Sequence, residues 1–335
     1  KYSVHKTAGN FNNEIGLPLT IFGIRESHQV AVLEMGISDF GEMHRLSAMS
    51  CPDVMVITNI GYCHLEFLGD RDGVLKAKTE CFEHMMPDAV AVLNADDDKL
   101  ATVQTVNGKP AIYYGKESAS DVHKSVYTTN IENLGFDGMK AHFVTPEGEF
   151  DAQIHIPGEH NVYNALAAIA AAKALGIPDA AIADGLLHFT GTDRRFEKKG
   201  ELNGITIIDD YAHHPQEIAA TLKAAHNYPH KKLWCVFQPH TYTRTKAFLD
   251  EFAEALSAAD AVILADIYAA RETDTLGISS ADIASRIEKL GTEVHYFPTF
   301  EEIEAFLLKN CSTGDLLITM GAGDIVKVGE KLLNK

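Results

Sequence analysis

The chain has 335 residues, of which 46% are hydrophobic and 23% are charged, and its formal net charge is −18. A single hydrophobic core seldom grows to this size, so two domains are expected, and no apolar run reaches the roughly 18 residues of a membrane helix. The acidic balance argues against a broad nucleic-acid surface, but it allows a local pocket for a phosphorylated small molecule.

The five cysteines are scattered and include no C-x-x-C pair. This spacing disfavours both a disulfide framework and a zinc knuckle, and it fits a protein of the reducing cytoplasm. The opening residues, KYSVHKTAGN, contain neither an initiator Met nor the apolar core of a signal peptide. We therefore expect that a segment upstream of Lys1 has been removed.

Apolar β-type runs alternate with helical patterns through the first half of the chain, the clearest runs being QVAVLEMG, DVMVITNI and AVAVLNADD. Such alternation predicts a parallel sheet. Residues 107–156 differ, because short alternating runs separated by Gly, Pro and Asn predict a small antiparallel insertion. A strong helix is predicted from Asn161, ending at Gly176 and Pro178, and a second helix follows it.

After Thr190 a new α/β series begins, with five β-type runs separated by helical patterns: GITIIDDY, KLWCVFQP, AVILADIY, VHYFP and DLLITMG. Five strands with intervening helices predict a self-sufficient, doubly wound, Rossmann-like domain. The expected domains are 1–192 and 193–335, and no internal repeat is present.

Two polar residues of the first domain follow predicted strands: Glu34 ends one strand and His64 lies just past another. Strand carboxyl ends line the ligand crevice of an open α/β sheet, so this pair could bind a divalent ion. A helix cap and a hydrogen-bonded loop histidine explain the same spacing, and the spacing alone favours this structural interpretation. Lys78 and Glu80 point to different helix faces, which is typical of a solvated charge pattern, and the acidic run 94–98 predicts a turn or a helix start.

Two further pairs of residues are candidates for binding. Asn161 and Asn164 share one helix face, and Arg194 and Arg195 precede the second domain, where guanidinium groups could grip phosphate. A helix cap and an exposed basic turn are the structural alternatives.

The run IIDDYAHHPQE brings several polar residues to one strand end, and Pro215 then fits the first turn of the next helix. Packing in a hydrophobic core does not readily explain so many polar side chains at one strand end. The adjacent His213 and His214 diverge and lack a ligand spacing, which disfavours a zinc site.

Ordered motifs give the chain a specific resemblance. In the first half they are TAGNFNNEIGLPLT, VLEMG, ITNIGYCHLEFLG, AKTE, LNADDD and GEHNVYNALAA; in the second half they are RRFEKKG, DDYAHHPQE, FQPHTYTRT, DIYAARE and GAGDI. The first set resembles the ATPase domain of Mur ligases, most closely of members that add D-alanyl-D-alanine. The second set resembles the amino-acid-binding domain of members that add L-alanine.

The resemblance implies a P-loop-type α/β central domain with an antiparallel insertion, followed by a Rossmann-like domain. It also implies site roles. These are Glu34 and His64 for Mg²⁺; Asn161, Asn164, Arg195 and Asp210 for ATP; Thr7, Asn10, Asn13, His214 and Arg244 for substrates; and Lys78 as a catalytic residue that several members carbamylate. His213 is the candidate general base, because imidazole titrates near neutrality.

The implied reaction is ATP-dependent amide synthesis in peptidoglycan precursor formation, joining L-alanine to UDP-N-acetylmuramate through an acyl phosphate. We expect ATP and Mg²⁺ as cofactors and a monomer or weak homo-oligomer, with neither nucleic-acid binding nor a membrane span. Arg271 stands where L-alanine-adding members often carry glycine. The alternatives are the addition of D-alanyl-D-alanine, a muropeptide-recycling or other Mur-like ligase acting on folate or polyglutamate, and a non-catalytic nucleotide-binding module.

One departure concerns ATP. The family's G-x-x-G-K-T phosphate loop is expected shortly before Thr7, and neither it nor the UDP-binding domain is in the sequence. We therefore expect the chain alone to be inactive and the loop to lie upstream.

Overall fold

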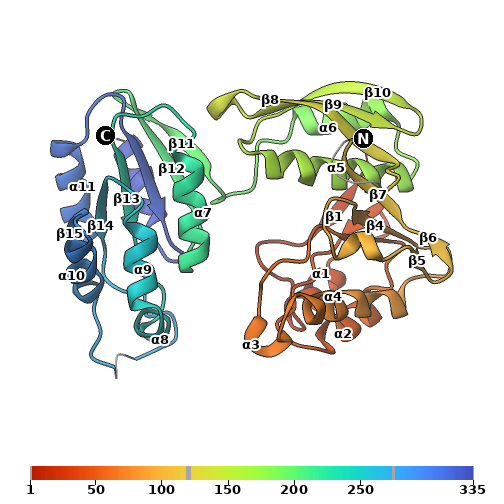
Figure 1. Ribbon diagram of the computed structural model, residues 1–335, viewed down its shortest axis with the longest axis horizontal. Coiled ribbons are helices and arrows are strands. Elements are labelled where there is room, and N and C mark those ends of the chain that lie inside the picture. Colours follow the sequence, from red (N-terminus) through yellow and green to blue (C-terminus); the bar gives the residue numbers. More distant parts are fainter. Residues whose placement is uncertain (1, 118–121, 274–275, 335) are drawn as a thin grey trace. The chain divides into compact units, whose positions relative to one another are not determined.

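The computed structural model describes residues 2–117, 122–273 and 276–334. It divides into two compact units, which are described separately (Figure 1). Unit 1 comprises residues 1–134 and 138–189, and unit 2 comprises residues 135–137 and 190–335. None of the helices in the described part of the chain combines the length and hydrophobicity that crossing a membrane requires.

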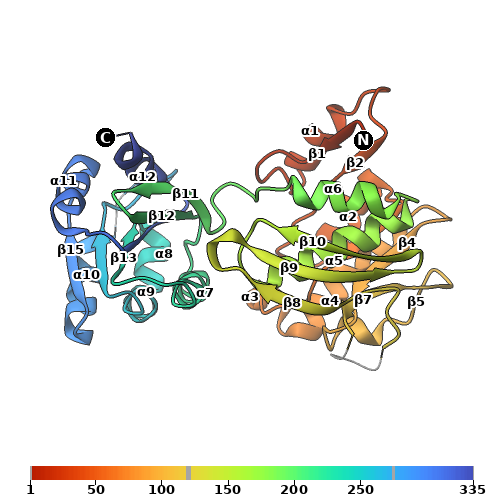
Figure 2. The ribbon, with the colours of Figure 1, turned by 90° about the horizontal axis from the view of Figure 1, so that it is seen from above.

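Unit 1 is built on one mixed sheet. Its strands, in spatial order, are β10 (Gly148–Ile154), β9 (Met139–Thr145), β8 (Val126–Asn133), β7 (Ile112–Lys116), β4 (Val90–Asn94) and β3 (Val54–Ile57). Strands β3, β4, β7 and β8 are parallel, whereas β8, β9 and β10 are antiparallel and lie side by side (Figure 2). The expected parallel sheet and antiparallel insertion are thus confirmed, but they form a continuous sheet, and β7 belongs to its parallel part.

Helices cover both faces of this sheet. The helical segments are α1 (Gly16–Phe22), α2 (Glu42–Ser50), α3 (Leu65–Leu68), α4 (Arg71–Thr79), α5 (Glu159–Ala174) and α6 (Asp179–Leu187), with 3₁₀ turns η1 (Glu80–His84) and η2 (Leu100–Thr102); the 3₁₀ turn η3 (Gly135–Asp137) belongs to unit 2. Alternate strand residues face opposite layers, so Leu93 packs with α2, α4 and η1 while Val92 packs with α5 and α6. Two small sheets complete the strands of this half: the parallel pair β1 (Val4–Lys6) and β2 (Val30–Val32), and the hairpin β5 (Thr105–Val106) and β6 (Lys109–Pro110).

Unit 2 has a six-stranded sheet in the order β11 (Glu197–Leu202), β12 (Ile205–Asp210), β16 (Leu316–Met320), β13 (Leu233–Phe237), β14 (Ala261–Leu264) and β15 (Glu293–Tyr296). The five predicted strands are parallel, as expected. The sixth, β11, is antiparallel to β12 and begins two residues after Arg195, in a stretch for which the sequence did not predict a strand.

The helices of unit 2 also form two layers. They are α7 (Pro215–Ala225), α8 (Tyr242–Ala247), α9 (Leu249–Leu256), α10 (Ser280–Leu290), α11 (Phe300–Asn310) and α12 (Val326–Leu333). Helices α7, α9 and α10 pack on one face, and α11 and α12 on the other. Because β16 lies between β12 and β13, the loops that follow β12, β16 and β13 are neighbours, which is where open α/β sheets bind ligands.

Candidate functional site

Glu34 lies two residues beyond β2 and is exposed. Its backbone nitrogen donates to Thr7 Oγ1 at 2.8 Å, and its Oε1 accepts from Asn12 Nδ2 at 2.8 Å. No other hydrogen bond to this carboxylate is present among residues 2–117, 122–273 and 276–334. The structure therefore groups the predicted Thr7 and Glu34 with Asn12, which sequence reasoning missed, and leaves one carboxylate oxygen for a ligand.

The other two predicted residues of this segment lie in the turn before α1. Asn13 Oδ1 accepts from the backbone nitrogens of Ile15 at 3.1 Å and Gly16 at 2.8 Å, so its side chain orders the start of that helix. Asn10 is exposed, and its carbonyl accepts from the backbone nitrogen of Asn12 at 2.8 Å. Of the two predicted substrate residues in this turn, Asn13 therefore uses its side-chain oxygen to stabilise the start of α1.

His64 is exposed and has a left-handed backbone, with φ of 52°, at the start of α3. Side chains from two other segments hold the backbone that leads to it. The contacts are Asn94 Nδ2 to Thr58 O (3.1 Å), Lys78 Nζ to Asn59 O (2.9 Å), Ile60 N to Asp97 Oδ2 (2.8 Å) and Arg71 Nε to Ile60 O (2.8 Å). Lys78 is thus directed at the loop that carries His64.

The acidic run 94–98, which was predicted as a turn or a helix start, also holds neighbouring segments together through its carboxylates. Asp98 forms two hydrogen bonds with Arg71, at 3.0 and 2.5 Å, and these lower the pKa of the Asp98 carboxyl. Asp96 Oδ2 accepts from Lys116 N at 2.7 Å and from the Tyr163 hydroxyl at 2.9 Å. The run therefore joins the carboxyl end of β4 to α4 and α5.

Glu80 is also engaged, which corrects its interpretation as part of a solvated charge pattern. Its carboxylate accepts from the backbone nitrogen of Gly41 at 3.0 and 2.9 Å, at the amino end of α2. A carboxylate in this position satisfies an otherwise unpaired helix nitrogen and opposes the positive end of the helix dipole.

The two predicted asparagines of α5 contact each other. Asn164 Nδ2 donates to Asn161 Oδ1 at 3.1 Å, and Asn161 Nδ2 donates to the carbonyl of Pro157 at 2.7 Å. Tyr163 lies between them in sequence and reaches Asp96, so this helix end is tied to the loop after β4.

In unit 2 the end of β12 carries two buried carboxylates. Asp209 accepts from Arg194 Nε at 2.9 Å and Thr319 Oγ1 at 2.6 Å. Asp210 accepts from the backbone nitrogens of Phe196 and Ala212, each at 2.8 Å. Burial raises the pKa of both carboxyls, and these hydrogen bonds oppose that effect. Both oxygens of Asp210 therefore order the protein's own loops.

The adjacent Arg194 and Arg195 have different surroundings. Arg194 donates to the carbonyls of Gly321 at 2.5 Å and Gly323 at 3.1 Å, and its guanidinium lies 4.9 Å from the centre of the Tyr211 ring. It thereby fastens the GAGD turn to the end of β12. Arg195 is exposed, and its charge partly opposes the rise that burial causes in the pKa of Asp210.

The loops after β12 and β13 bring three basic side chains together. His213 Nδ1 lies 3.0 Å from the carbonyl of Tyr211, and its ring centre is 6.0 Å from that of His240. Arg244 Nη1 lies 3.4 Å from His240 Nδ1. Burial, with a smaller contribution from Arg244, lowers the pKa of His240. His240 is a candidate that sequence reasoning missed, although it lies within the quoted FQPHTYTRT motif.

His214 has different surroundings from its neighbour. Its ring packs edge-on against Phe248, with ring centres 4.8 Å apart, and its backbone nitrogen donates to Glu217 at 3.2 Å at the start of α7. The ring of His213 therefore lies beside His240, whereas the ring of His214 packs against Phe248.

Comparisons with known proteins agree with this architecture. Residues 1–172 match the Mur ligase middle domain, and residues 194–323 match the Mur ligase glutamate ligase domain. The UDP-N-acetylmuramate–L-alanine ligase of Lachnospira eligens is 49% identical over 288 residues, covering 84% of this chain and 61% of that protein. The enzyme of the same name from Lachnoclostridium phytofermentans is 42% identical over 335 residues, covering 98% of this chain and 71% of that protein.

A solved structure shows the same fold. The MurF ligase of Thermotoga maritima, in complex with ADP, has a TM-score of 0.73 and 25% identity, and the match covers 100% of this chain and 74% of that one. This chain spans 61% of the length of the Lachnospira relative. Both halves of the chain match one family in the same order, and the chain belongs to the Mur ligase family.

Proposed function

We propose that this chain forms the middle and C-terminal parts of an ATP-dependent ligase that joins L-alanine to UDP-N-acetylmuramate in peptidoglycan precursor synthesis. The observation that carries the proposal is the 42% identity over 335 residues with a protein named for that reaction, extending through both units. The DDYAHHPQE loop, which bears His213, supports the same assignment.

ATP and Mg²⁺ are the proposed cofactors. A related ligase was solved with ADP. The donors on unit 1 suit Mg²⁺, because Glu34 offers an exposed carboxylate oxygen and Asn12 fixes the other one. His64 is the proposed second ligand, on a loop that Lys78 and Asp97 hold in place. ATP would supply the phosphoryl group that activates the carboxylate of UDP-N-acetylmuramate as an acyl phosphate.

The proposed amino-acid side lies on unit 2. Since the Tyr211 carbonyl can only accept, His213 Nδ1 must carry the hydrogen, and Nε2 is left with the lone pair that a general base requires. Arg244 can pair with the carboxylate of the incoming amino acid. Arg195, Asn161 and Asn164 remain the proposed nucleotide contacts, and Asp210 would act by ordering the backbone of Phe196, the residue next to Arg195.

A panel of amino acids tests the substrate choice. The product of the whole gene would be incubated with ATP, Mg²⁺, either UDP-N-acetylmuramate or a UDP-muramoyl peptide, and L-alanine, D-alanine, glycine or D-alanyl-D-alanine, and the products identified by mass spectrometry. We expect the L-alanine adduct to form fastest. If D-alanyl-D-alanine were incorporated preferentially into a UDP-muramoyl peptide acceptor, the MurF-like alternative would replace this proposal.

ATP binding without product formation, from every amino acid and acceptor tried, would instead support the non-catalytic nucleotide-binding module. Such a result requires that the protein be folded and that a known Mur ligase be active in the same assay.

A further inference from the structure

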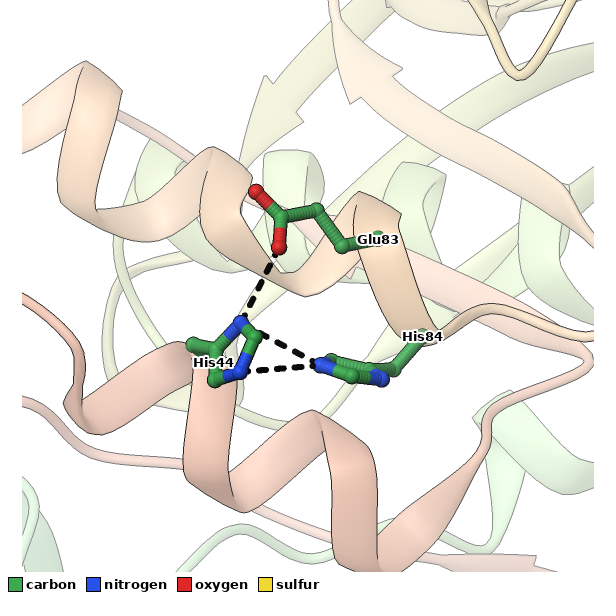
Figure 3. A group of neighbouring side chains, drawn as sticks. All are labelled: His44, Glu83 and His84. Carbon is green, nitrogen blue, oxygen red and sulfur yellow. Dashed lines mark hydrogen bonds and ion pairs between the residues drawn. The ribbon is translucent and has the colours of Figure 1, made fainter.

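Three potential metal ligands meet on unit 1, and none of them belongs to the proposed ligase site. His44 projects from α2, whereas Glu83 and His84 project from η1 (Figure 3). His44 Nδ1 lies 3.0 Å from Glu83 Oε2 and 3.2 Å from His84 Nε2, and His44 Nε2 lies 3.3 Å from His84 Nε2. One nitrogen or oxygen from each side chain therefore reaches the same small volume.

The separations of His44 Nδ1 from Glu83 Oε2 and from His84 Nε2 match those of neighbouring ligands around a bound metal ion, and the three ligand atoms all lie within 4.8 Å of one another. A tetrahedral zinc ion with zinc–nitrogen bonds of about 2.0–2.1 Å holds two ligand nitrogens about 3.3 Å apart. The separations also fit a hydrogen-bonded cluster in which one imidazole donates to the other. The two explanations differ in one respect: only the first predicts that a metal ion stabilises the cluster.

The backbone that carries the three ligands is fixed by other contacts. Glu80, the first residue of η1, accepts from the backbone nitrogen of Gly41 just before α2. Met43 and Cys81 then bury the facing sides of the two segments in one core cluster. Because packing and the Glu80 contacts already set the spacing of α2 and η1, binding a metal would require ordering of side chains alone.

The chemistry of the ligands selects the kind of ion. Two imidazoles and one carboxylate suit zinc, whereas Mg²⁺ prefers oxygen ligands. The side chains of His44 and Glu83 are 47% and 64% exposed, so water can reach the remaining coordination position. We propose that His44, Glu83 and His84 form a zinc-binding site that joins α2 to η1, with water as the fourth ligand.

Thermal unfolding of the untagged chain with added Zn²⁺ tests this site. The background should be Cys51→Ser, Cys63→Ser, because these exposed thiols would also bind zinc. We expect Zn²⁺, and not an equal concentration of Mg²⁺, to raise the Tm. The rise should be lost in His44→Gln, His84→Gln, since a ligand stabilises a fold only by binding its native state.

Two matched controls separate this site from the others. His188→Gln removes the exposed histidine that follows α6, and His64→Gln alters the proposed magnesium site, and both should retain the full zinc-dependent rise. If the double variant has a lowered Tm without metal, Glu83→Gln replaces it, and Co²⁺ absorbance then reports whether a tetrahedral site is lost. An equal zinc response in wild type and ligand variants, or no response in either, would show that the cluster is only hydrogen-bonded.

Discussion

Arg194 Nε donates to the buried carboxylate of Asp209 at 2.9 Å, and the same guanidinium holds the carbonyls of Gly321 and Gly323. Asp209 is fully buried, whereas the Arg194 side chain is 21% exposed. One arginine thus neutralises a buried charge and joins the loop after β16 to the end of β12. The neighbouring Arg195 is exposed and is the one available to a ligand.

Replacing Arg194 with Met should destabilise unit 2 by about 3 kcal/mol, because it leaves the buried Asp209 carboxylate without its cation. Urea unfolding followed by the fluorescence of Trp234, the only tryptophan in the chain, reports on this unit. Arg195→Met is the matched control and should cost less than about 0.5 kcal/mol. Equal losses in the two variants would contradict the assigned roles.

Asp210 should give unit 2 a characteristic pH dependence. Burial raises its pKa in the folded chain above the ordinary value of about 3.9, so the folded state keeps the proton where the unfolded state has released it. Stability contributed by this group therefore falls as pH rises through that window. Asp210→Asn cannot titrate, so the unfolding free energy of wild type minus that of the variant should decrease from about pH 4 upward. A difference that increases with pH would mean that the pKa is lowered.

Much of the fold could be predicted from the sequence, because alternating apolar and helical runs determine which segments become buried strands. Strand β11 escaped prediction because an edge strand need not be apolar; its sequence is EKKGEL. The hydrogen bond between Asp97 and Ile60 could not be predicted from the sequence either, because it joins residues 37 positions apart and its donor is a backbone nitrogen.

Site prediction had a similar limit. The motifs indicated candidate functional segments, but not which side chains point into the protein. Arg194 and Arg195 are adjacent and chemically identical, and the inward direction of Arg194 accompanies a left-handed backbone, with φ of 61°. Likewise, the sequence does not indicate that Asn13 is used by α1 while Asn12 holds Glu34.

Glu34→Gln should weaken the dependence of activity on Mg²⁺. Loss of the ligand charge should raise the Mg²⁺ concentration that gives half-maximal phosphate release by at least about tenfold. Glu26→Gln, which changes an exposed glutamate before β2, should leave the Mg²⁺ titration unchanged. Superimposable titrations for the two variants would remove Glu34 from the metal site.

His213 and His214 should differ although they are neighbours. His213→Gln should lower kcat by about 100-fold or more, as expected for loss of a general base, with a smaller change in the KM for L-alanine. His214→Gln, which affects the contact with Phe248, should retain most of the activity and reduce stability instead. Steady-state kinetics and thermal unfolding of both variants distinguish these effects, and a greater loss of kcat in His214→Gln would reverse the assignment.

The most direct test of the ligase proposal is phosphate release from ATP by the product of the whole gene, measured with UDP-N-acetylmuramate in the presence and absence of L-alanine. The proposal predicts release that depends on both substrates and equals the amount of amide formed. Release no faster with L-alanine than without any amino acid would contradict it.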